Sequence, residues 1–198
     1  MARPLLRSKH TSRSAERSRG GGSAAEARFR RPVLRFMTLF VVFVGAFYAV
    51  NLTPVFEDHV WPWYLRVNAR MSGDLLRGLG EPVTVAGRRI SSVRGGLSIE
   101  RGCDALQPSA LFIAAVLAFP ASMWKRIPGL LVGTLVLMVI NLVRIVSLYY
   151  VQVFWPGAFE IMHVEVWQAL FIFLALLFWV FWARWATRRP AVTADATN

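Results

Sequence analysis

Four long, strongly apolar segments constrain this chain more than any other feature of its sequence. They cover residues 32–52, 105–123, 128–153 and 164–185. Each has close to the ~20 residues that an α-helix needs to cross about 30 Å of hydrocarbon. Hydrophobic residues make up 56% of the chain, and the mean hydropathy is +0.46. The sequence therefore predicts an all-α polytopic membrane protein whose four transmembrane helices pack as one bundle.

Positive charge is concentrated near the N-terminus, where residues 1–35 carry a net +8 of the chain's +12. The rest of residues 1–31 is mostly Ser, Gly and Ala, which predicts a disordered basic tail that contacts anionic membrane lipids rather than nucleic acid. Lys125 and Arg126 lie between the second and third segments, and residues 184–189 contain three more arginines. Basic residues favour the cytoplasmic side. We therefore expect both termini, including a second tail at residues 187–198, to be cytoplasmic.

The membrane domain predicted for residues 32–186 begins with an uncleaved anchor and includes an extracytoplasmic loop, residues 53–104. Within this loop, residues 64–79 have helical spacing and predict an amphipathic helix along the membrane surface. Its apolar residues are Leu65, Ala69, Leu75, Leu76 and Leu79. Residues 82–99 alternate with period two and contain turn glycines, which predicts a β-hairpin. This cap either positions a peptide, by pairing with a strand edge, or only connects two helices.

Cys103 is the only cysteine of the chain and directly precedes the second apolar segment. Asp104 and Gln107 match the N-cap and third helical position of a capping box. Cys103 would then precede the cap, where backbone N–H groups stabilise a thiolate or an oxyanion. Because the Asp104 carboxylate opposes a thiolate, the direction of any shift in the thiol pKa stays open.

Arg144 and His163 are expected at the same outer level as Cys103. Arg144 lies 16 residues after Pro128, about 24 Å along a helix axis, and His163 directly precedes the fourth segment. Asn141 shares the helix face of Arg144. The three residues together predict a site built on three helix ends. The alternatives are an inert buried cysteine, a structural histidine and an arginine that binds a lipid phosphate. One Cys and one His make a poor metal site, so no metal or cofactor is expected.

Residues 102–167 resemble the exosortase/archaeosortase family of membrane cysteine transpeptidases, and the short chain is most similar to the compact exosortase H branch. The matching elements are Gly102-Cys103, Leu117-Ala118-Phe119-Pro120, Asn141-Leu142-Val143-Arg144-Ile145, and His163 followed by Trp167-Gln168. One departure concerns Asp104-Ala105, where the family often has a small polar residue and Gly. This difference leaves the substrate preference open.

The resemblance implies a protein of the bacterial inner membrane that cleaves secreted proteins at a C-terminal tail, which consists of a short motif, a membrane helix and a basic end. It implies that Cys103 forms a thioester, that His163 is the general acid and base, and that Arg144 holds the thiolate or oxyanion. Glu160 and Glu165 are candidates to orient His163, although helical spacing disfavours Glu165. The sorting motif, the acceptor, the oligomeric state and the balance of hydrolysis and transfer stay undefined. The alternative function is a non-enzymatic membrane binding or assembly factor in which Arg144 binds a headgroup.

Overall fold

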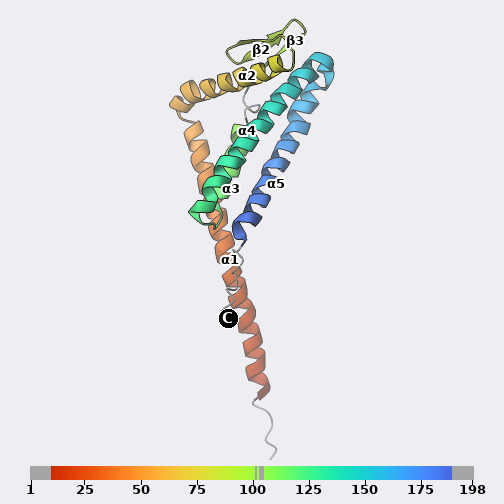
Figure 1. Ribbon diagram of the computed structural model, residues 1–198. Helices are drawn as coiled ribbons and strands as arrows, with labels where there is room; N and C mark the ends of the chain where they lie inside the picture. Colours follow the sequence, from red (N-terminus) through yellow and green to blue (C-terminus); the bar gives the residue numbers. More distant parts are fainter. Residues whose placement is uncertain (1–9, 101, 103–104, 189–198) are drawn as a thin grey trace, which may run out of the picture.

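The computed structural model describes residues 10–100, 102 and 105–188, with side chains from Arg30 onward (Figure 1). A long helix, α1, leads to a cap made of α2 and a small sheet, and the chain then returns through α3, α4 and α5. The elements are α1 (His10–Asn51), η1 (Phe56–Val60), α2 (Trp61–Gly78), β1 (Thr84–Ala86), β2 (Arg89–Ser92), β3 (Gly95–Ser98), α3 (Leu106–Ala118), α4 (Met123–Phe154), η2 (Pro156–Ala158), η3 (Ile161–Val166) and α5 (Trp167–Thr187).

Three helical stretches in the described part of the chain are long and apolar enough to cross a membrane. They are Arg30–Asn51 within α1, Met123–Phe154, and Ile161–Thr187, which combines η3 with α5. The prediction of a mostly helical membrane protein is therefore confirmed. Helix α1 begins at His10, so it includes residues 10–31, where the composition predicts a disordered tail.

Helix α3 is shorter than the second predicted span. It has 13 residues, which corresponds to about 20 Å, whereas the prediction extends over residues 105–123. Phe119 ends the helix in an extended conformation, with φ −69° and ψ 138°. Pro120 explains this ending, because a proline has no N–H to donate and disfavours the helical conformation in the residue before it. Helix α3 still packs against α1, α4 and α5.

Helix α2 buries one stripe of small and apolar side chains and exposes its charges. The stripe consists of Trp61, Leu65, Asn68, Ala69, Ser72, Gly73 and Leu76. Of the apolar residues predicted for this helix, Leu65, Ala69 and Leu76 are buried. The prediction is wrong at Leu75 and Leu79, which are 41% and 58% exposed. Leu75 lies about 100° around the helix from Leu76, and Leu79 follows the end of α2 at Gly78.

The sheet contains three short antiparallel strands in the order β1-β2-β3, so it forms two hairpins where the sequence predicts one. Val85 pairs with Ile90, which pairs in turn with Leu97. Gly87 has φ +63° in the first turn, a conformation that glycine adopts without steric cost. Because Ile90 and Leu97 are buried on one face, the sheet is fixed against its neighbours at a single register.

Two apolar clusters organise the molecule. The first joins α2, the sheet, the C-terminal part of α4 and Trp167 at the start of α5. The second joins α3, α4 and α5 near the other end. Glycines allow close helix contact there, because a Cβ at Gly129 would overlap the ring of Trp182 and one at Gly133 would overlap that of Phe112. The first cluster surrounds the residues that the sequence nominates as a site.

Candidate functional site

Arg144 is a buried charge in the C-terminal half of α4. It follows Met123 by 21 residues, about 32 Å along the helix, and only 2% of its surface is exposed. Its Nη2 donates a hydrogen bond to the main-chain oxygen of His163 at 3.3 Å. The structure therefore brings together Arg144 and His163, two of the three residues that the sequence predicts for the site, from separate helical segments. A buried guanidinium needs such partners, because an uncompensated charge is expensive away from water.

His163 lies in η3, a π-helical segment that leads into α5, rather than in a regular α-helix. π-Helical turns are uncommon and are frequently found at functional sites. The ring of Phe159 stacks on the imidazole, with centroids 5.5 Å apart and an interplanar angle of 19°. This stacking limits the orientations of the imidazole. Glu160 and Glu165, which the sequence nominates to orient His163, are both exposed.

Cys103 and Asp104 lie outside the described residues. On either side of them, Ile99 is fully buried in the first cluster and Leu106 packs against its edge. The capping prediction needs correction, because α3 begins at Leu106 and its N-cap is Ala105, without a side-chain cap hydrogen bond. Ala105 has φ +55°. An alanine rarely adopts this left-handed conformation, so the chain turns sharply just before α3.

A buried amide pair adds a residue that sequence reasoning missed. Asn141, one helical turn before Arg144, donates from Nδ2 to Oδ1 of Asn68 in α2 at 3.0 Å, and both residues have 0% exposure. Asn68 in turn donates to the main-chain oxygen of Tyr64 at 3.0 Å. Oδ1 of Asn141 has no hydrogen-bond partner among the described residues. The available signal was a polar residue on the buried stripe of α2, between Leu65 and Ala69.

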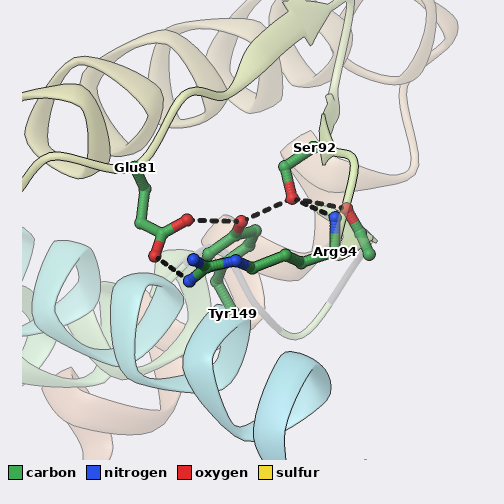
Figure 2. A network of polar contacts seen from close by, with 5 residues as sticks. Glu81, Ser92, Arg94 and Tyr149 are labelled. Atoms are coloured by element: carbon green, nitrogen blue, oxygen red, sulfur yellow. Dashed lines mark hydrogen bonds and ion pairs between the residues drawn. The ribbon is translucent and has the colours of Figure 1, made fainter.

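A second polar network attaches the sheet to α4 (Figure 2). The hydroxyl of buried Tyr149 lies 2.8 Å from Oγ of Ser92 and 3.5 Å from Oε2 of Glu81. Glu81 also pairs with Arg94 at 3.1 Å, and the Glu81 side chain is only 12% exposed. The network therefore fixes the β2–β3 hairpin against the helix that carries Arg144.

Within the described ranges, no three His, Cys, Asp or Glu side chains lie close enough together to hold a metal ion. The arrangement instead brings a buried cation, an oriented imidazole and a buried amide pair to the end of the bundle that carries the cap. These groups suit acyl-transfer chemistry, in which a cation or N–H donor stabilises an oxyanion and an imidazole moves a proton.

Comparison with known proteins adds one match. Residues 26–182 match the model of a family described as transmembrane exosortase (Exosortase_EpsH). The matched region covers most of the chain and contains α2, the sheet, Arg144 and His163. No curated protein and no solved structure matches the chain with significance.

Proposed function

Because this chain belongs to the transmembrane exosortase family, we propose that it is a membrane cysteine transpeptidase or peptidase that cleaves the C-terminal sorting tail of secreted proteins. Cys103 is the nucleophile, His163 the general acid and base, and Arg144 the oxyanion stabiliser. The tail consists of a short motif, a membrane helix and a basic end. The product passes to an acceptor amine or to water.

The observation that carries this proposal is the contact of Arg144 with the main chain at His163. The Nη2 to carbonyl distance is 3.3 Å, and the arginine is 2% exposed. A guanidinium carries five N–H donors in one plane. The hydrogen bond to the main chain fixes the orientation of this plane, and in the proposed mechanism the plane faces the oxyanion of the substrate. The burial of Arg144 also disfavours the alternative, in which this residue binds a lipid headgroup at the surface.

Chain connectivity supports the assignment of Cys103 to the same site. Cys103 is three residues from Leu106, which packs against the cluster containing Ile145 and Trp167. Three residues span at most about 11 Å. Ile145 is the neighbour of Arg144 in sequence, and Trp167 follows His163 by one helical turn. This supports an assignment in which the thiol, guanidinium and imidazole serve one reaction.

The chemistry proceeds in two transfers. The thiolate of Cys103 attacks the scissile carbonyl carbon, and the oxyanion that forms is stabilised by Arg144. The C–N bond then breaks, and the departing amine takes a proton from the His163 imidazolium, leaving a thioester on Cys103. An acceptor amine or water next attacks the thioester while His163 removes its proton, and the thiolate is released.

Membrane placement suits this substrate. The distribution of basic residues favours cytoplasmic termini, which supports a location of the cap and Arg144 at the outer face of the bacterial inner membrane. A sorting motif just outside the membrane helix of a substrate reaches the same depth. Packing of α2 and the sheet over this end excludes water, which favours transfer over hydrolysis.

The test is co-expression of the full chain with a secreted reporter that carries a C-terminal motif, membrane helix and basic end. The catalytic variants are Cys103→Ser, Arg144→Ala and His163→Ala. The matched controls are Arg66→Ala and His59→Ala, because both residues are exposed and lie in the cap region. Immunoblots measure reporter cleavage and confirm equal amounts of each variant in the membrane.

Loss of cleavage in all three catalytic variants, with normal cleavage in both controls, is the expected result. Full cleavage by Cys103→Ser would end the thiol mechanism. If Arg144→Ala alone impaired a membrane phenotype while Cys103→Ser was silent, the binding or assembly factor would replace the enzyme.

A further inference from the structure

A basic cavity lies at the end of the bundle opposite the cap, away from Arg144 and His163. It has a volume of about 430 Å³ and lies between α1 and the connection from α3 to α4. Its lining contains three arginines, Arg31, Arg35 and Arg126, beside small and apolar residues. No described carboxylate forms an ion pair with any of them. The cavity therefore presents concentrated positive charge that the protein's described residues do not neutralise.

Arg126 is built into the wall of this cavity rather than free at the surface. Its Nη2 donates to the main-chain oxygen of Phe119 at 3.1 Å, which orients the guanidinium. Its Nε is buried and has no hydrogen-bond partner among the described residues. Arg31 and Arg35 are exposed on successive turns of α1. One oriented guanidinium and two exposed ones suit a tetrahedral anion such as a phosphate group.

Helices α1 and α3 also line a second, apolar cavity. On α1, Arg31, Arg35 and Leu39 line the basic cavity, and Phe43 and Phe47 line the next. These five residues are spaced by four, so they follow one ridge of the helix. On α3, Ala118 lines the basic cavity, and residues from Leu106 to Leu117 line the apolar one, whose volume is about 290 Å³.

We propose that an anionic phospholipid occupies this site, with its phosphate held by Arg31, Arg35 and Arg126 and one acyl chain along the α1–α3 groove. A charged cavity followed by an apolar one along the same two helices matches the two parts of a lipid, and basic pockets between transmembrane helices are known binding sites for anionic headgroups. A soluble phosphate compound would fill only the basic cavity. The lipid bridges α1 and α3 and is separate from the proposed catalytic residues.

The experiment titrates the purified full chain in neutral detergent with dioleoylphosphatidylglycerol or dioleoylphosphatidylcholine and counts bound lipids by native mass spectrometry. The main variant is Arg31→Gln with Arg35→Gln, because both residues are exposed and their loss does not disturb packing. Arg126→Gln is the second variant. The matched control is Arg184→Gln with Arg188→Gln, which removes two exposed arginines from the end of α5 that do not line the cavity. Glycerol phosphate is added as the soluble competitor.

We expect the wild-type chain to bind phosphatidylglycerol at least tenfold more tightly than phosphatidylcholine. Each arginine near a charged headgroup contributes about fivefold, so the Arg31/Arg35 double variant loses roughly 25-fold in affinity while the control loses less than twofold. Equal losses in variant and control would show general attraction and overturn the site. Equal binding of the two lipids, or displacement by millimolar glycerol phosphate, would also overturn it, the latter in favour of a soluble phosphate ligand.

Discussion

Asn68 and Asn141 allow a double-mutant cycle that tests whether the cap and the helix bearing Arg144 are coupled. Their side chains share a hydrogen bond of 3.0 Å, and neither residue is exposed. Removing one partner of a buried hydrogen bond costs about 1–3 kcal/mol, because the remaining group loses its partner without regaining water. Asn68→Ala also removes the bond to the main chain of Tyr64. We therefore expect each alanine variant to lower the free energy of unfolding by about 2–3 kcal/mol.

The double variant should be less damaged than the sum of the two single variants. Once both amides are absent, no orphaned group is left by the broken bond, so the coupling energy should be about 1–2 kcal/mol, near the upper end for membrane proteins. Thermal unfolding in detergent measures this directly. A change of 1 kcal/mol corresponds to a Tm shift of roughly 2–4 °C for a chain of this size.

Asn51 provides the matched control for this cycle. Its side chain bonds only to the main-chain oxygen of Phe47 in its own helix among the described contacts, at 2.7 Å. Asn51→Ala combined with Asn141→Ala should be additive within about 0.5 kcal/mol. If Asn68→Ala with Asn141→Ala were equally additive, the buried pair would not link α2 to α4, and the argument that the cap positions the Arg144 face would fail.

Three further changes test other contacts. Arg144→Lys keeps the charge but loses the planar donor set, so reporter cleavage should fall about 10²-fold; near wild-type cleavage would show that charge alone suffices. Tyr149→Phe should cost only about 1 kcal/mol, because the other network members keep partners; a Tm loss in detergent above 10 °C would contradict this. Gly133→Leu should lower Tm strongly, because a side chain added at this position overlaps the ring of Phe112. Gly45→Leu is the control: a side chain there meets open space and should leave Tm within 2 °C. Equal losses of Tm for both variants would exclude close α3–α4 packing.

Some of this structure is predictable from the chain because the signals are local. Three of the apolar segments contain helices of membrane-spanning length, and the β-pattern of residues 82–99 indicates strands where the structure has them. Phe119-Pro120 also signals the early end of α3 in the sequence. The apolar run continues past this proline, however, and hides the end of the helix from a hydropathy analysis. Hydropathy measures transfer from water and does not register the missing N–H of a proline.

The tertiary partners of the site were not predictable in the same way. Helix length places Arg144 and His163 at one level, but it does not show that the guanidinium binds a main-chain carbonyl. Nor does it indicate that Asn68, 73 residues away in sequence, bonds to Asn141. Such contacts depend on how α2 folds back over α4, which is decided by the packing of the whole first cluster rather than by any one segment.

Polar contacts gather at the end of α4 that carries the buried Arg144. An arginine among apolar residues is expensive in lipid, and the cost falls only when the bundle itself supplies polar groups. Segment η3 contributes the carbonyl of His163 to the guanidinium, and one helical turn away Asn141 of α4 donates to Asn68 of α2. Helix α2 thus covers the polar end of α4 with an amide as well as with apolar side chains. Variants that loosen the cap should therefore displace the Arg144 guanidinium before the membrane helices unfold. Such variants should lose reporter cleavage at temperatures where the membrane helices remain folded.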